Sequence, residues 1–389
     1  MIGFEILKSD AKTKARLGRL QLKHGIVETP VFMPVGTYGA VRGLAAWELA
    51  QSGSQIMLSN TYHLAIRPGV DLIEQLGGLH SFTSWDRPIL TDSGGFQIFS
   101  LSKNRKITDE GAFFQDPASG QKFFFSPESV VQIQERFGSD IMMVFDECPP
   151  ADASIDIIEN AVRRTSLWAQ RCKQAYRDRE LMLFPINQGA CDLDLRRRSL
   201  DELLNLEKDG EPWRGLAIGG LSVGESKSDF VRTLHGLRNS LPVEKPHYLM
   251  GVGSPRDLVF GVCCGIDMFD CVIPSRNARH GIVMTRQGRL NLYNKEHEAS
   301  DQALDSECQC LTCKNYSRAF LRHLFQKTEA LGQRLATLHN IQYFIDLMSL
   351  IRSKIAEGSL YEFAFEFLRD PRQVYLGKER DFEAFPEEF

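Results

Sequence analysis

The chain has 389 residues, of which 43% are hydrophobic and 25% are charged, and its formal net charge is −4. This composition is ordinary for a folded globular protein and excludes a chain that is disordered over long stretches. The small negative charge argues against a protein that packages nucleic acid with a basic surface. It allows a local basic face, and residues 276–295 and 314–334 each gather Arg and Lys side chains. Taken alone, such stretches are typical of solvated faces.

The N-terminal residues and the cysteines indicate the compartment. Residues 1–20 carry several charged side chains and lack the apolar core of a signal peptide. No apolar run approaches the roughly 18 residues of a membrane span. We therefore expect a cytoplasmic, reducing location with no membrane contact. Three of the nine cysteines, Cys308, Cys310 and Cys313, are clustered, and in a reducing compartment they indicate a metal site rather than disulfides.

Short apolar runs recur along the chain, and each ends abruptly in a polar residue or a glycine. Continuous runs of this length are typical of strands that are buried on both faces, as in a parallel sheet. The runs cover residues 56–58, 89–90, 141–145, 181–186, 216–218, 248–250 and 268–269, and they lead to Asn60, Asp92, Asp146, Gln188, Gly220, Gly251 and Asp270.

Helical segments with start and stop signals lie between these runs. Ser126 and Pro127 open a helix that ends at Phe137, before Gly138; residues 154–176 form another, and Ser254 opens a third. Alternation of strands and helices over this length predicts a parallel α/β fold. A closed barrel and an open doubly wound sheet both fit the alternation. The barrel is favoured because it gathers the polar ends of all its strands at one mouth.

The pattern changes after residue 290, where the strand-like runs stop. The cysteine cluster follows, and then two helical stretches over residues 316–331 and 335–356. We expect one catalytic (β/α)8 TIM barrel over residues 1–389, with a small zinc-binding subdomain, residues 291–345, inserted near its C-terminal end. Three thiolates and one imidazole complete the tetrahedral shell of a structural zinc. On spacing alone, His339 and His323 compete for the fourth position.

Three carboxylates end predicted strands. Asp92 lies in the segment TDSGGFQ, where Gly94 and Gly95 allow a ligand to approach the backbone closely. Asp146 and Asp270 end two other runs, and the glycine-rich exit 219–225 supplies a tight turn. Carboxylates at one barrel mouth repel one another unless they are hydrogen-bonded or bind an electropositive group. Two carboxylates across a glycosidic carbon support displacement by a nucleophile and a general acid/base.

Together these motifs resemble those of the queuine and archaeosine tRNA-ribosyltransferases, the tRNA-guanine transglycosylase family. The matching segments are MPVGTYG (33–39), NTYHLAIRPG (60–69), TDSGGFQ (91–97), FDEC (145–148), NQG (187–189), GGLSVGE (219–225), YLMGVG (248–253), FDCVIPSR (269–276) and the C-terminal CxCxxC. They keep the family's order and cover almost the whole chain. The resemblance implies a zinc-containing (β/α)8 barrel, usually a homodimer, that exchanges guanine at the wobble position of tRNAs with GUN anticodons.

The resemblance also implies a role for each matching residue. Asp270 would be the nucleophile on the ribose C1′ atom, Asp92 the general acid/base, and His339 the fourth zinc ligand, which decides against His323. Phe96 and Met250 would sandwich the base. The implied base-binding residues are Ser93, Gly94, Gly95, Phe96, Asp146, Gln188, Gly220, Leu221 and Met250. The implied contacts with the tRNA anticodon loop are Gly251, Val252, Gly253, Ser254, Pro255, Arg256, Asp257, Ser275, Arg276, Asn277, Ala278 and Arg279.

Family branches differ in the base that they insert. Val223 and Cys148 favour the bacterial branch, which inserts the aminomethyl base preQ1, over the branch that inserts queuine. Two positions depart from the family pattern: Ser275 stands where threonine is usual, and His280 stands where asparagine or a similar residue is usual. Two other hypotheses are a non-catalytic RNA-binding paralogue, which retention of Asp92 and Asp270 disfavours, and a zinc-dependent barrel hydrolase, which a complete thiolate-rich zinc shell disfavours.

Overall fold

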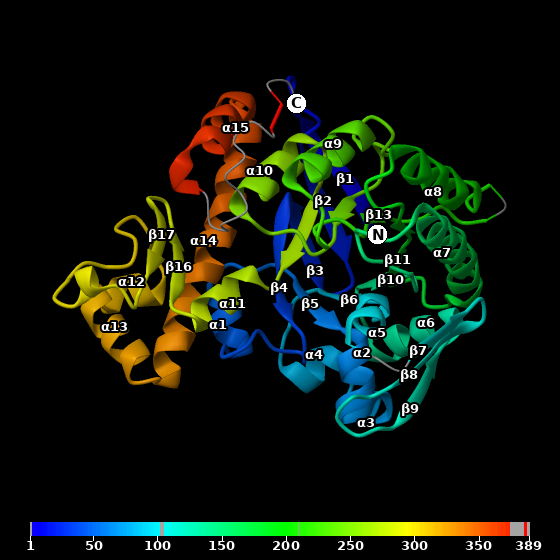
Figure 1. Ribbon diagram of the computed structural model, residues 1–389, viewed down its shortest axis with the longest axis horizontal. Helices are drawn as coiled ribbons and strands as arrows, with labels where there is room; N and C mark the ends of the chain where they lie inside the picture. Colours follow the sequence, from blue (N-terminus) through cyan, green and yellow to red (C-terminus); the bar gives the residue numbers. More distant parts are fainter. Residues whose placement is uncertain (1, 102–104, 209, 374–384, 387–389) are drawn as a thin grey trace.

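A ring of parallel strands forms the centre of the molecule (Figure 1). The computed structural model describes residues 2–101, 105–208, 210–373 and 385–386. In these residues the central sheet has nine strands in the order β11-β10-β6-β5-β4-β15-β14-β13-β12. Their bounds are β4 (Val31–Gly36), β5 (Met57–Asn60), β6 (Ile89–Asp92), β10 (Ile141–Met143), β11 (Met182–Phe184), β12 (Ile186–Asn187), β13 (Leu216–Ile218), β14 (His247–Leu249) and β15 (Met268–Cys271).

The sheet closes on itself through a strand that is broken in two. Only Pro185 separates β11 from β12; β11 pairs with β10, whereas β12 pairs with β13. Proline has no N–H group for a ladder, although its carbonyl accepts a 2.9 Å hydrogen bond from the Ala217 amide. With β11 and β12 counted as one, the nine strands become eight. The predicted (β/α)8 barrel is confirmed, and the open sheet is excluded.

Helices cover the outside of the barrel, and their ends follow the predicted signals. α6 (Pro127–Phe137) begins after Ser126, whose side chain accepts an amide hydrogen bond, and ends at Gly138 with a left-handed φ of 71°. The other helices that follow the barrel strands are α1 (Ala46–Gln51), α3 (Val70–Gln75), α4 (Gly78–Thr83), α7 (Ile155–Ala175), α8 (Leu193–Asn205), α9 (Lys227–Leu237) and α10 (Pro255–Cys263). Three short helices, α2 (Thr61–Leu64), α5 (Gly95–Leu101) and α11 (Ile273–Arg279), begin at or just after the carboxyl ends of β5, β6 and β15, at the mouth of the barrel. Among the described residues, no helix combines the length and apolar character that a bilayer crossing requires.

Two antiparallel sheets accompany the barrel, and the sequence patterns predict neither. One contains β1 (Gly3–Ser9), β2 (Arg16–Leu22) and β3 (Gly25–Thr29), and the other contains β7 (Arg105–Thr108), β8 (Gly111–Gln115) and β9 (Lys122–Phe125). The first sheet is joined to the barrel through Asp140, a fully buried residue just before β10. Its carboxylate accepts hydrogen bonds from the amides of His24 and Ile89 and faces ring nitrogens of His24 and His80 at 3.0 and 3.1 Å.

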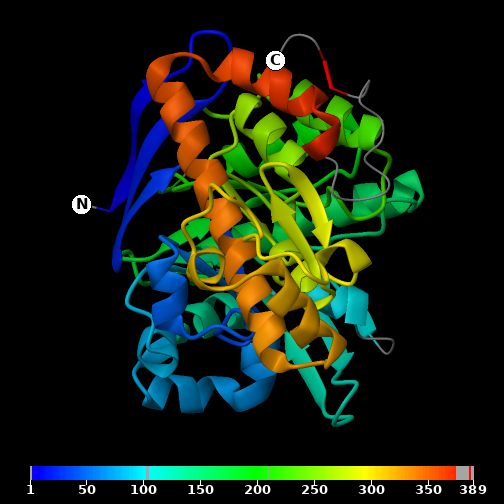
Figure 2. The same ribbon diagram turned by 90° about the vertical axis from the view of Figure 1, so that its left-hand side faces the viewer.

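The C-terminal segment extends from one side of the barrel (Figure 1). It contains β16 (Ile282–Thr285), β17 (Gly288–Asn291), α12 (Leu311–Asn315), α13 (Arg318–Gln326), α14 (Ala330–Glu357) and α15 (Leu360–Arg369). The prediction of a helix over residues 316–331 is wrong at its end, because Thr328 takes a left-handed φ of 56° and separates α13 from α14. The second helix consequently starts at Ala330 rather than at Leu335. Figure 2 shows α14 running along this side of the molecule from α13 to α15.

Candidate active site and metal centre

The carboxyl ends of the barrel strands surround a cavity of about 640 Å³. Both expected catalytic aspartates and all of the expected base-binding residues line this cavity. They are Asp92, Ser93, Gly94, Gly95, Phe96, Asp146, Gln188, Gly220, Leu221, Met250 and Asp270. The structure therefore brings together side chains that are separated in the sequence by nearly half of the chain.

Asp92 ends β6 and is held by the segment that follows β5. Its Oδ1 accepts hydrogen bonds from the amides of Thr61 (3.1 Å) and Gly94 (3.2 Å), and its Oδ2 accepts one from the side-chain amide of Asn60. Burial raises the pKa of Asp92 to about 7, and the nearby charge of Asp270 adds to the rise against these hydrogen bonds. At neutral pH this carboxyl is therefore poised both to donate and to accept a proton.

Asp270 lies on β15 and is almost fully buried. Its Oδ1 accepts hydrogen bonds from the Tyr248 hydroxyl (2.6 Å) and the Gly251 amide (2.7 Å). Burial raises the pKa of Asp270, and these two hydrogen bonds oppose the rise. The contacts fix the carboxylate at one oxygen and stabilise its ionised form, as a nucleophilic carboxylate requires.

Asp146 follows β10 and is bound on both oxygens. The Ser93 hydroxyl donates to Oδ1 and the side-chain amide of Gln188 donates to Oδ2, both at 2.8 Å. Burial raises the pKa of Asp146 to about 6, although the two hydrogen bonds oppose the rise. Each oxygen keeps acceptor capacity, so the carboxylate is able to receive two N–H groups from one edge of a flat heterocycle.

Two glycines make room for these side chains. A Cβ atom on Gly95 would lie 2.5 Å from the carbonyl oxygen of Asp146, and one on Gly220 would lie 2.4 Å from Oε1 of Gln188. Gly220 also has a left-handed φ of 65°. Both positions therefore require glycine, because any side chain would push Asp146 or Gln188 out of place.

The two segments expected to contact RNA, residues 251–257 and 275–279, differ in how many of their side chains are exposed. Gly251, Arg276 and Asn277 line the cavity. Arg276 is exposed and Arg279 is half-buried, and the pKa of Arg279 is lowered by burial and then by the charges of Arg42 and Arg276. The three arginines thus form a cationic group beside the cavity, and Arg42 is a member that the sequence motifs did not reveal.

Most other members of these segments have buried side chains with partners in the protein. Arg256 donates to the Leu368 carbonyl, and Asp257 pairs with Lys227 at 2.6 Å. The remaining buried members are Val252, Gly253, Ser254, Pro255, Ser275 and Ala278. Their side chains support the local fold, and contact with RNA remains a prediction for the exposed residues.

Two further residues of the site were quoted in the sequence motifs without a role. Asn60 donates to Asp92 and Tyr248 donates to Asp270, the two aspartates expected to be catalytic. Asn60 was identifiable as the polar residue that ends a predicted strand. Tyr248 gave no such signal, because it lies inside an apolar run and only the closed barrel turns its hydroxyl toward Asp270.

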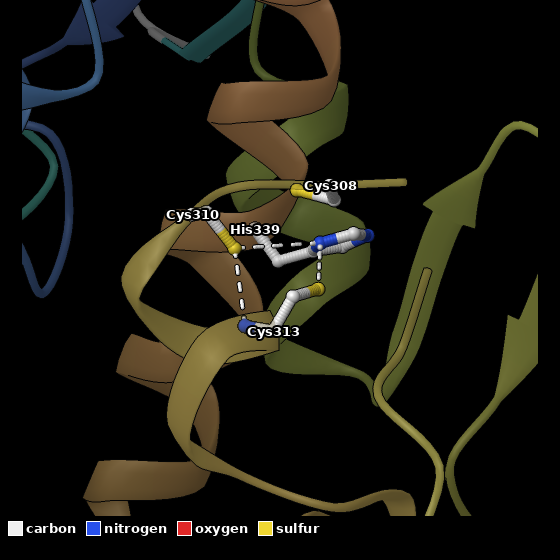
Figure 3. A group of neighbouring side chains, drawn as sticks. All are labelled: Cys308, Cys310, Cys313 and His339. Atoms are coloured by element: carbon white, nitrogen blue, oxygen red, sulfur yellow. Dashed lines mark hydrogen bonds between the residues drawn. The ribbon is translucent and has the colours of Figure 1, made fainter. Parts of the chain in front are cut away.

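A second cluster lies at the start of α12, far along the chain from the cavity residues. Figure 3 shows Cys308, Cys310, Cys313 and His339 pointing toward one another. The Nδ1 atom of His339 lies 3.2 Å from the Cys313 sulfur and 3.7 Å from the Cys310 sulfur. Its Nε2 lies 2.8 Å from the Met284 carbonyl, so Nε2 carries the proton and Nδ1 presents its lone pair to the sulfurs.

These four residues fit a tetrahedral metal ion with one nitrogen and three sulfur ligands. His323 is not in the cluster, so the structure selects His339. The next residue, Asn340, connects the cluster to the barrel. Its side-chain amide donates to the Pro274 carbonyl at 3.0 Å, and its Oδ1 accepts the Met284 amide at 3.0 Å.

Fold and site together define a class of protein: a (β/α)8 barrel with buried carboxylates at the carboxyl ends of its strands and a Cys₃His cluster that could hold a metal ion. The comparisons with known proteins identify the family. The protein-family model described as queuine tRNA-ribosyltransferase matches residues 10–373 of this chain. A protein of that name from Halothermothrix orenii is 50% identical over 377 residues, which cover 97% of this chain and 99% of that protein.

Other relatives agree. Proteins named queuine tRNA-ribosyltransferase from Bacillus subtilis and Hydrogenovibrio crunogenus are each 50% identical to this chain. The matches span 367 and 364 residues, cover 94% of this chain, and cover 95% and 96% of the relatives. The chain therefore belongs to the queuine tRNA-ribosyltransferase family.

Proposed function

We propose that this protein is a pentosyltransferase that exchanges guanine at the wobble position of GUN-anticodon tRNAs for preQ1, a precursor of queuosine. The observation that carries the proposal is the pair Asp92 and Asp270, two buried carboxylates that line one cavity and are each held by hydrogen bonds. The family match and the names of the relatives supply the substrate class.

In the proposed mechanism, a carboxylate oxygen of Asp270 attacks the ribose C1′ atom of the guanosine. The C1′–N9 bond breaks, and the departing guanine takes a proton from Asp92. Asp92 then removes the N9 proton of the incoming preQ1, which attacks C1′ and releases Asp270 from its ester. Two inversions retain the β configuration, and no ATP is needed because one glycosidic bond replaces another.

The base is held by stacking and by its polar edge. Phe96 and Met250 offer an aromatic ring and a thioether as a slot for a flat heterocycle. Asp146, Gln188 and the Gly220 backbone read the purine edge. The target base leaves the anticodon loop to enter the cavity, at small cost because a loop nucleotide is largely unpaired. Arg276 and Arg279 then bind the phosphates or the neighbouring bases.

The Cys₃His centre holds a structural zinc in this proposal, with one ion per chain. It contributes folding free energy to the subdomain of residues 291–345 and takes no part in the chemistry. We further propose that the enzyme works as a homodimer in the cytoplasm, where its tRNA substrate is found. Mass photometry of the zinc-loaded protein tests the dimer directly.

An exchange assay tests the proposal. Unmodified tRNA incubated with the enzyme should incorporate labelled guanine, and it should lose that label when preQ1 is added. With a poor acceptor base, a tRNA–protein adduct that survives denaturant should accumulate. Asp270→Asn should lose both the adduct and the exchange. Exchange at the wild-type rate by that variant would remove Asp270 from the role of nucleophile.

A further inference from the structure

A buried arginine lies behind the wall of the cavity that carries Gln188. Arg196 is on α8 and is fully buried, yet no salt bridge to it exists among the residues that the structure describes. Burial lowers the pKa of Arg196 to about 10, so the side chain is still a cation at neutral pH. A buried cation without an ion-pair partner is costly. Its presence therefore calls for a reason beyond packing.

The guanidinium group binds the turn that carries Gln188. Its Nε donates to the Ala190 carbonyl at 2.9 Å, and its Nη1 donates to the Asn187 carbonyl at 2.8 Å. The Asn187 side chain returns a 2.8 Å hydrogen bond to the Arg196 carbonyl. The hydroxyl of Ser199, one turn further along α8, accepts a hydrogen bond from the backbone amide of Gln188 at 3.1 Å. Arg196 and Ser199, on one face of α8, thus form hydrogen bonds along the whole turn from residue 187 to residue 190.

The turn itself is too tight to hold this shape unaided. Ala190 has a left-handed φ of 47°, and a Cβ atom on Gly189 would lie 2.8 Å from the Arg196 amide nitrogen. A left-handed alanine costs free energy that the surrounding contacts must supply. The hydrogen bonds from Arg196 to the carbonyls of Asn187 and Ala190, on either side of Gln188, offset this cost.

The charge of Arg196 also acts on the Gln188 side chain. Two buried polar atoms here have no hydrogen-bond partner: Nη2 of Arg196 and Oε1 of Gln188. A Cβ atom on Gly220 would lie 3.8 Å from the first and 2.4 Å from the second, so both atoms border the same glycine. A cation at this place favours the amide orientation that keeps Oε1 near it. In that orientation the Nε2 donor faces Asp146 and the cavity.

We propose that Arg196 is a positioning residue for base recognition, which fixes the turn of residues 187–190 and orients the Gln188 amide so that it donates to the base. This inference rests on the proposed function, in which Gln188 reads the purine edge. It predicts that Arg196 controls discrimination between bases that offer an acceptor to that donor and bases that do not. Guanine has a 6-oxo acceptor, and 2-aminopurine lacks it.

The test compares the inhibition constants of guanine and 2-aminopurine in wild type, Arg196→Lys and Arg196→Met, together with the KM for tRNA and the melting temperature. Arg16→Met is the control for loss of a buried arginine remote from Gln188. Arg16 is also buried and binds the backbone carbonyls of Val243 and Lys245, and it pairs in addition with Asp267 at 2.7 Å. Arg196→Met should lose at least tenfold of the preference for guanine, while the KM for tRNA stays within twofold. Arg196→Lys keeps the charge and should lose less.

Arg16→Met should lower the melting temperature without changing the base preference. A preference retained within twofold in both Arg196 variants, or an equal loss in the Arg16 control, would overturn the inference. The wild-type measurement distinguishes failure of the proposed function from failure of the positioning role. If wild-type enzyme puts no labelled guanine into tRNA, the proposed function fails; if it does so and the Arg196 variants discriminate normally, only the positioning role fails.

Discussion

The Tyr248 hydroxyl and the Gly251 amide both donate to Oδ1 of Asp270, and no hydrogen bond reaches Oδ2 within the part of the chain that the structure describes. The two oxygens of this carboxylate are therefore not equivalent. Oδ1 anchors the side chain and disperses its charge, and Oδ2 keeps its lone pairs for an electrophile. We infer that Oδ2 is the atom that attacks the ribose.

Tyr248→Phe tests this division of roles. Burial raises the pKa of Asp270 and the tyrosine hydrogen bond opposes the rise, so its loss should move the pKa further up. The variant should lose about tenfold in kcat/KM at neutral pH, as expected for one charged hydrogen bond of about 1.4 kcal/mol. The acidic limb of its pH profile should move to higher pH. Tyr176→Phe is the control, because Tyr176 is buried and donates to the Leu181 carbonyl outside the site. An unchanged acidic limb would contradict the role of Tyr248.

The pKa of Asp92 sets the other limb of the profile. Release of guanine needs the protonated acid, and burial raises the pKa of Asp92 to about 7. The protonated fraction falls as pH rises through that value, so kcat/KM should decline about tenfold per pH unit above it. Asp92→Asn should be slow and should lack this decline. Rates measured from pH 5 to pH 9 with labelled guanine decide the matter, and a decline that persists in Asp92→Asn would assign the limb to another group.

Zinc removal should damage stability before it damages the base pocket. Cys310→Ser should lose about one zinc per chain by elemental analysis, and its melting temperature should fall by roughly 5–10 °C. Cys191→Ser is the matched control, because Cys191 is a half-buried cysteine outside the cluster. Full stability and activity of folded, metal-free protein would rule out a structural role for zinc.

Val223 should set the size limit for the incoming base. It lines the cavity together with Cys148, and its amide is held by Glu225 at 2.9 Å. The wild type should use preQ1 and largely reject queuine, since steric rejection in a packed pocket reaches a few kcal/mol. Val223→Gly should raise queuine incorporation and lower preQ1 use modestly. Val243→Gly, at an exposed valine, should change neither. Equal use of both bases by the wild type would remove the argument for the bacterial branch.

The barrel was predictable because its strands are buried on both faces and leave uninterrupted apolar runs. Each predicted run forms a barrel strand, and the polar residue or glycine to which it leads lines the cavity. The first strand, β4, escaped prediction because Pro34 stands inside it. The antiparallel sheets escaped for a different reason: β1 is largely exposed, so its residues show neither continuous hydrophobicity nor a clear alternation.

The residues of the site also differ in whether the sequence alone revealed them. Asp92, Asp146 and Asp270 were visible as carboxylates at strand ends. Arg196 was not, because a basic residue within the helical sequence LDLRRRS looks like any solvent-facing arginine. Its importance follows only from the position of α8 behind the turn of residues 187–190. Side chains that act from behind a cavity leave no local pattern, and they become recognisable only when the whole chain is folded.

The hydrogen bonds of Asn340 predict which property of the enzyme loss of the metal would affect. It directly follows His339, the expected fourth metal ligand, on α14, and its side chain donates a hydrogen bond to the Pro274 carbonyl in α11, the helix that carries Arg276 and Arg279. Within the described residues, neither Asp146 nor Gln188 forms a hydrogen bond with the cluster or with Asn340. Loss of zinc should therefore weaken tRNA binding more than base binding. Free base still enters the pocket, while tRNA dissociates faster. Undermodified tRNA would then reflect both a less stable enzyme and weaker tRNA binding by the enzyme that remains folded.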